Sequence, residues 1–143
     1  VIAYAQFWSE AYQQKINDRA KAAKDAKAAG QTARYDELAA AMKKEQEQNH
    51  LRVFSTAPVD DILAGMKDRV EGMQKEVGVS QLVSKWDEKT LKGYKKYQQV
   101  EVTDQLLREF KLNEKQLKVV SDMRKKEPLP LKKAEELMRE GKL

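Results

Sequence analysis

The chain has 143 residues, of which 41% are hydrophobic and 36% are charged, and it contains no cysteine. This length is sufficient for one domain with a buried core. The absence of cysteine excludes a disulfide framework, a thiolate nucleophile and a zinc ribbon. The net charge is +5, and the whole excess lies after residue 78, where there are 16 basic and 11 acidic residues. Such an excess is typical of a solvated surface of mixed sign, and it also permits an anionic partner.

Glycine and proline are scarce, and apolar residues recur at three- and four-residue steps, so we predict an all-α fold. We expect an N-terminal antiparallel helical hairpin over residues 1–57. A helical bundle is expected over residues 58–143, with a trihelical tail from about residue 103.

The start of the chain is rich in aromatic residues: Tyr4, Phe7, Trp8 and Tyr12. They could form the interfacial belt of a membrane-proximal segment, and residues 3–5 (Ala-Tyr-Ala) have the small-x-small form of a signal-peptidase site. These features lead us to expect a segment upstream of Val1, and they slightly favour an extracytoplasmic or membrane-associated protein. The alternative is that three of the aromatics and Ile16, spaced by four, form the core stripe of a first helix. These two interpretations imply different cellular compartments, and the sequence is compatible with both.

The first helix is expected to continue through an alanine- and lysine-rich stretch to Ala29, where Gly30 supplies a C-terminal cap. A second helix is expected from Thr32. The short connection between them predicts an antiparallel pair. Residues 43–50 have no apolar stripe, which indicates a solvated part of this hairpin.

The clearest amphipathic pattern lies in residues 58–77, which we predict to be one central helix. Asp60 and Asp61 place negative charge near its N-terminus, and Gly78 provides a stop. The apolar stripe consists of Val59, Ile62, Leu63, Met66, Val70, Met73 and Val77.

Four further helices are expected after Gly78. The first runs from Ser80 to about residue 99, and a shorter one is capped by Thr103. Asn113 with a glutamine three residues later has the pattern of a capping box that starts a third helix. A Pro-Leu-Pro segment at residues 128–130 ends this helix, and the last one begins at Leu131 and is closed by Gly141.

Catalytic and metal-binding patterns are absent from the sequence. There is no Gly-x-Ser-x-Gly motif and no glycine-rich phosphate loop, so we expect neither an enzyme nor a cofactor. The only histidine, His50, follows Glu47 with the Glu-x-x-His spacing of di-iron bundles, but a di-iron centre needs a second such pair and two more glutamates. We therefore predict no metal site.

A stretch of alternating basic and aromatic side chains is the candidate patch for an anionic partner: Lys85, Trp86, Lys89, Lys92, Tyr94, Lys95, Lys96 and Tyr97. Such side chains can hold phosphates and stack on bases. Residues 113–127 and 131–140 have the layout of a helix-turn-helix unit, although the second helix carries three basic and three acidic residues. The alternative is that the aromatic residues form the core stripe of their helix.

The function most consistent with long amphipathic helices is non-enzymatic: a protein–protein interaction or structural protein, such as an adaptor, a holdase or a subunit of a larger assembly. Its partner would be another protein, and the N-terminus could contact a membrane. A helical nucleic-acid-binding module that uses residues 85–97 and the trihelical tail is the alternative function.

Overall fold

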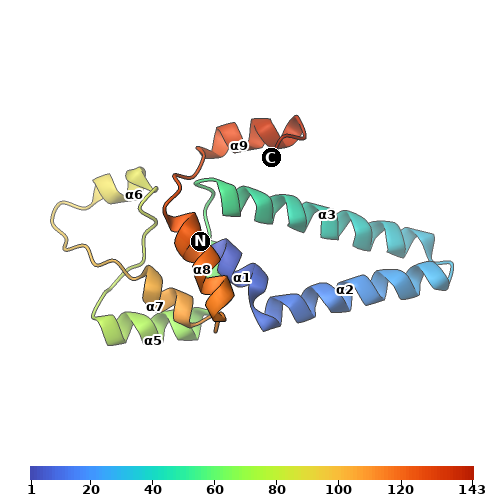
Figure 1. Ribbon diagram of the computed structural model, residues 1–143, viewed down its shortest axis with the longest axis horizontal. Helices are drawn as coiled ribbons and strands as arrows, with labels where there is room; N and C mark the ends of the chain where they lie inside the picture. Colours follow the sequence, from blue (N-terminus) through green and yellow to red (C-terminus); the bar gives the residue numbers. More distant parts are fainter.

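The computed structural model describes residues 1–143 and confirms the all-α prediction, with nine helices and no strand. The helices are α1 (Ile2–Trp8), α2 (Glu10–Ala28), α3 (Thr32–Phe54), α4 (Asp60–Ala64), α5 (Lys67–Val77), α6 (Glu88–Gly93), α7 (Thr103–Arg108), α8 (Glu114–Arg124) and α9 (Leu131–Arg139). Helices α2 and α3 form a long arm, and the shorter helices gather at its base (Figure 1). We call this group of shorter helices the body.

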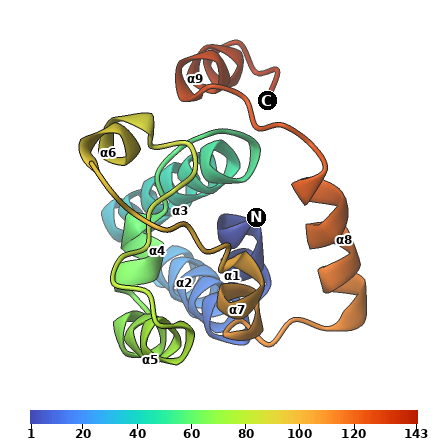
Figure 2. The same cartoon turned by 90° about the vertical axis from the view of Figure 1, so that its left-hand side faces the viewer.

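Helix α1 lies inside the body and packs against α7, α8 and the base of the arm (Figures 1 and 2). Its residues Ala3 and Ala5 are fully buried, and their small side chains allow the neighbouring helices to approach closely. The core cluster that they join is drawn from distant parts of the chain: Ala3, Ala5, Ile62, Leu107, Phe110 and Val120. The first residues of the chain are therefore part of the main core.

The first helix, predicted to be continuous to Ala29, is interrupted at Ser9. The Ser9 hydroxyl donates to the carbonyl oxygen of Gln6 at 2.7 Å and accepts from the backbone N–H of Tyr12 at 3.3 Å. One side chain thereby closes α1 and caps the N-terminus of α2. The predicted four-residue stripe is broken as well, because the Trp8 side chain is 42% exposed whereas Tyr12 is buried.

The arm is a thin antiparallel pair of helices (Figure 1). Gly30 ends α2 with φ +69°, a left-handed conformation that glycine adopts without steric cost, as its position in the sequence predicted. The buried residues in the outer part of α2 are Ala23 and Ala26. Alanine methyl groups rather than large side chains therefore fill this part of the interface.

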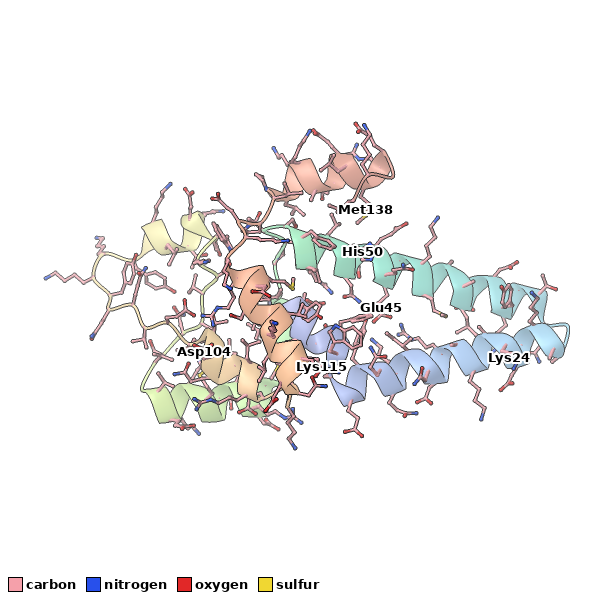
Figure 3. The ribbon with its side chains drawn as sticks, in the orientation of Figure 1. Lys24, Glu45, His50, Asp104, Lys115 and Met138 are labelled. Atoms are coloured by element: carbon pink, nitrogen blue, oxygen red, sulfur yellow. The ribbon has the colours of Figure 1, made fainter.

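Close to the body, the seam between α2 and α3 is polar. Asn49 is buried and donates from its Nδ2 to the hydroxyl of Tyr12. Glu45, which is labelled in Figure 3, accepts from Lys15 Nζ at 2.8 Å and also pairs with the guanidinium of Arg19. The prediction that residues 43–50 are a solvated stretch is therefore wrong for Glu45 and Asn49. These two residues contact α2 through ion pairs and a hydrogen bond instead of apolar packing.

This seam alters the acid–base properties of two of its members. Burial raises the pKa of the Tyr12 hydroxyl. Partial burial acts in the same direction on Glu45, but the hydrogen bond from Lys15 and the charges of Lys15 and Arg19 outweigh it, so the pKa of this carboxyl lies below its ordinary value. Glu45 is thus held as a carboxylate between two cations.

The central stretch, predicted as one helix, forms two helices that are separated at Gly65 and Met66. Met66 has φ −125° and ψ 34°, which takes the backbone out of the helical region. A glycine inside a helix costs about 1 kcal/mol relative to alanine, which favours a break beside Gly65. On either side of it, Ile62 and Met73 are the buried residues of α4 and α5.

Helix α8 begins as predicted, with a capping box. The side chain of Asn113 accepts from the backbone N–H of Gln116 at 3.0 Å, and the side chain of Gln116 accepts from the backbone N–H of Asn113 at 2.9 Å. Helix α8 packs on α1 through Val120, which is 1% exposed.

Helix α9 packs elsewhere, on α3, where Ala134 is completely buried. The segment that precedes α9 is tied to the end of the arm, because the N–H of Leu129 donates to the carbonyl of Phe54 and the N–H of Thr56 donates to the carbonyl of Leu129, each at 2.9 Å. Helices α8 and α9 therefore lie on different parts of the molecule (Figure 2). The helix-turn-helix layout predicted for residues 113–140 is wrong.

Candidate anionic-partner site

Residues 85–97, which we call the basic aromatic loop, contain the patch predicted for an anionic partner. The predicted helix from Ser80 to about residue 99 is wrong, because only α6 is helical there. Asp87 caps α6 by accepting from the backbone N–H of Thr90 at 3.0 Å, and the helix ends after Gly93. No residue between Val79 and Val102 is buried.

The aromatic side chains of this loop are open to solvent. Trp86 is 40% exposed and Tyr97 is 51% exposed, while Tyr94 is half-buried. The rings of Tyr94 and Tyr97 are adjacent, with centroids 5.5 Å apart and planes inclined at 58°. The predicted alternative, a core stripe of aromatic residues, is therefore wrong.

A residue outside the predicted patch positions this aromatic pair. The Tyr94 hydroxyl donates to Oε1 of Gln81, 13 positions earlier in the chain. This contact links the Tyr94 hydroxyl to the segment before α6. The Tyr97 hydroxyl accepts from Nε2 of Gln99 at 3.4 Å, and its ring is exposed. Nothing in the local sequence around Gln81 indicates this role, because the contact depends on how the irregular segment folds back.

Five lysines and two carboxylates give the loop its charge. Glu88 accepts from Lys92 Nζ at 2.7 Å, and Asp87 is used as the cap of α6. Lys85 Nζ lies 4.8 Å from the centroid of the Trp86 ring, a cation–π arrangement. The other three lysines, Lys89, Lys95 and Lys96, form no ion pair within the molecule.

Both carboxylates of the loop are ionised at neutral pH. Hydrogen bonds from the side chain and backbone of Thr90 lower the pKa of Asp87, and the hydrogen bond and charge of Lys92 lower the pKa of Glu88. Asp87 accepts hydrogen bonds from Thr90, and Glu88 forms an ion pair with Lys92. The positive charge available to another molecule is therefore mainly that of the lysines without an ion pair.

A shallow open depression of about 340 Å³ lies beside the paired tyrosines. Its lining combines the α6 ion pair with apolar and aromatic surface: Glu88, Leu91, Lys92, Tyr94 and Tyr97. The loop stands at the end of the molecule opposite the α2–α3 turn (Figure 1). The geometry is that of an exposed contact surface.

The predicted membrane-proximal residues have different environments. Tyr12 is buried in the polar seam, Tyr4 and Phe7 are half-buried, and Trp8 is exposed. Phe7 contacts Trp8 edge to face, with ring centroids 5.3 Å apart. None of the nine helices combines the length and the apolar character needed to span a bilayer.

Glu47 and His50 have the Glu-x-x-His spacing that was considered for a di-iron site. Both side chains are exposed on α3. The centroids of the His50 and Phe54 rings are 6.2 Å apart. Figure 3 labels His50 on α3. No three His, Cys, Asp or Glu side chains gather in a way that could hold a metal ion. Asp61, at the start of α4, pairs with Arg52 at 2.6 Å, which is a structural use of this carboxylate.

No family model, curated protein or solved structure matches this chain.

Proposed function

We propose that this chain is a non-enzymatic binding protein, in which a helical body displays the basic aromatic loop to a negatively charged macromolecule. The observation that carries the proposal is the exposure of Trp86 and Tyr97 next to lysines without an internal partner. A single exposed aromatic side chain is ordinary, and Trp8 and Phe54 are exposed to a similar extent. The loop differs because it gathers three aromatic residues and five lysines within 13 residues. Trp and Tyr are also the residues most enriched at the energetic centres of interfaces.

The test is retention on a column of immobilised heparin, a polyanion, with elution by salt. The triple variant Lys89→Gln, Lys95→Gln and Lys96→Gln is expected to elute at clearly lower salt than the wild-type chain. A matched control removes the same charge from the arm, at Lys21, Lys24 and Lys44, none of which forms an ion pair. Figure 3 places Lys24 at the far end of the arm.

The control variant should elute close to the wild-type chain. If both triple variants elute together, net charge alone governs retention and the loop is not the binding surface. If the wild-type chain is not retained at low salt, the proposal fails.

A second candidate function, that of an adaptor or assembly subunit that binds another protein, is supported by the arm. The arm extends away from the body (Figure 1), and the buried residues of its outer part are the alanines Ala23 and Ala26. An element that adds so little to the core is suited to contacting a partner. Replacing residues 22–41 by a short flexible turn should leave heparin retention intact if the arm and the loop serve separate partners.

A further inference from the structure

We infer that the basic aromatic loop binds single-stranded nucleic acid, with bases stacked on Trp86 and Tyr97 and phosphates held by the free lysines. This inference rests on the proposed function and names the class of its partner. It also makes the contribution of the aromatic residues separable from that of charge.

The aromatic residues are arranged for stacking. Trp86 is 40% exposed and Tyr97 is 51% exposed, and the Tyr97 ring lies beside the ring of Tyr94, whose hydroxyl donates to Gln81. Every nucleobase has a flat π-face, so exposed rings can stack on bases without regard to sequence. The open depression beside the two tyrosines is lined in addition by Leu91 and by the Glu88–Lys92 ion pair.

The cations are placed between and beside these rings along the chain. Lys89 follows Trp86, and Lys95 and Lys96 separate the two tyrosines. Phosphate contacts release counterions, and for single strands each contact contributes about −0.7 to the slope of log affinity against log salt concentration. Three such lysines therefore predict a slope near −2 from the loop alone, as an order of magnitude.

A duplex fits this site less well than a single strand. The bases of a duplex are stacked on each other and offer no free face to an aromatic side chain. The helix in the loop, α6, has only six residues and begins next to Asp87 with Glu88 in its first turn, which opposes insertion into a groove lined by phosphates. The predicted helix-turn-helix unit, which would suit a duplex, does not form.

The experiment is fluorescence anisotropy with a labelled oligothymidylate of 12 nucleotides at low and near-physiological salt. An abasic oligonucleotide of the same length serves as the matched probe, because it has the same phosphates without bases. The protein variants are Trp86→Leu with Tyr97→Leu, which removes the rings, and the Lys89, Lys95 and Lys96→Gln triple variant. Poly-glutamate of similar charge and a DNA duplex are the competitors.

We expect the wild-type chain to bind oligothymidylate at least about tenfold more tightly than the abasic probe, since stacking on one ring is worth about a factor of ten. The Leu variant should lose that preference and bind both probes equally. The lysine variant should bind both probes more weakly, with a salt slope smaller by about 2. Neither poly-glutamate nor the duplex should displace the strand efficiently.

Equal affinity of the wild-type chain for the two probes would overturn the inference, as would a Leu variant that keeps the preference. Displacement by poly-glutamate at equal charge would point instead to an acidic protein as the partner. In each of these cases, loop-dependent heparin retention would leave the proposed function intact. Failure to be retained on heparin would overturn both.

A second readout follows the loop directly. The chain has two tryptophans, so the Trp8→Phe variant leaves Trp86 as the only one. Stacking of a base on this ring should quench its fluorescence, with a titration midpoint equal to the dissociation constant from anisotropy. Unchanged Trp86 fluorescence at saturating oligothymidylate would overturn the stacking arrangement.

Discussion

Asn49 of α3 donates a hydrogen bond to the hydroxyl of Tyr12 on α2, and both residues are buried. The pair joins the two helices at the level where α3 has no apolar stripe. A buried amide and a buried hydroxyl each need a partner, because an unsatisfied polar group costs free energy. This polar contact therefore joins the two helices of the arm to each other at its base, beside the carboxylate of Glu45.

Replacing one member of the pair should reduce the free energy of unfolding. Tyr12→Phe leaves the buried amide of Asn49 without its acceptor, at a cost of about 1–3 kcal/mol. Asn49→Leu removes one partner of the Tyr12 hydroxyl, which keeps its hydrogen bond with Glu45, so this variant should lose less. The double variant should be more stable than the sum of the single effects predicts, because both polar groups are gone. Urea unfolding of the four proteins measures this coupling, and strictly additive losses would contradict it.

Glu45 should make the stability of the chain dependent on acid pH. Its pKa in the folded state is lowered from the ordinary value of 4.5. The carboxylate therefore contributes stability that is fully present above about pH 4.5, and this contribution is lost as pH falls through the folded-state pKa. Glu45→Gln should lower stability at neutral pH and flatten the decline below pH 4.5.

The matched control for this experiment is Glu47→Gln, which removes an exposed carboxylate of α3 that forms no ion pair. Chemical unfolding of both variants between pH 3 and pH 7 gives the comparison. A decline in the Glu45→Gln variant as steep as in the wild-type chain would show that the charged seam does not contribute to it.

The sequence predicted best those features that depend on neighbouring residues. The capping box at Asn113 and the glycine caps at Gly30 and Gly78 formed where expected, because a cap needs only its own side chain or backbone and the next turn. The polar seam was not predicted, since Tyr12 and Asn49 lie 37 positions apart and meet only after the arm has folded.

The basic aromatic loop shows the limit of helical periodicity. Trp86, Thr90 and Tyr94 have the spacing of a helix face, but such a face is stabilised only if another element covers it. In this fold the core cluster comes from α1, α4, α7 with the turn after it, and α8, and no buried residue comes from residues 79–102. The residue types of the candidate site could therefore be predicted, but not their exposure.

The division of the central stretch into α4 and α5 predicts unequal sensitivity along its apolar stripe. Ile62 is 4% exposed and belongs to the main core cluster, whereas Val70 is half-buried. Ile62→Asp places an uncompensated charge in the core, so this variant should fail to fold and should show no cooperative melting transition. Val70→Asp should unfold cooperatively with a smaller loss, which thermal melting followed by circular dichroism measures.

The order of these two effects is the critical result. If Val70→Asp destabilises the chain as much as Ile62→Asp does, the stripe behaves as one continuous buried helix. The conservative variant Ile62→Val should cost about 1 kcal/mol, which checks that position 62 is tightly packed.

Helix α9 should be separable from the rest of the fold. Ala134 has no exposed surface against α3, so the larger side chain of Ala134→Leu cannot be accommodated without displacement and should cost about 1–3 kcal/mol. The loss should be local, because α9 is attached mainly to the end of the arm through Leu129.

Amide hydrogen exchange measures whether this effect is local. In Ala134→Leu, the backbone N–H groups of Thr56 and Leu129 should exchange faster, while that of Val120 in α8 stays protected. Ala40→Leu, at an exposed position of α3, is the size-matched control and should change none of these amides. Faster exchange of Val120 would indicate that α9 is part of the global folding unit.

The aromatic rings of the basic aromatic loop should contribute little to stability. Trp86 and Tyr97 are exposed and belong to no buried cluster, so Trp86→Leu and Tyr97→Leu should each change the free energy of unfolding by no more than about 0.5 kcal/mol. Tyr12→Phe, at a buried aromatic position, supplies the contrast. Urea unfolding of the three variants decides the matter: a loss above about 1 kcal/mol at position 86 or 97 would mean that the ring is structural, whereas neutrality leaves an exposed aromatic surface whose use must be sought in binding.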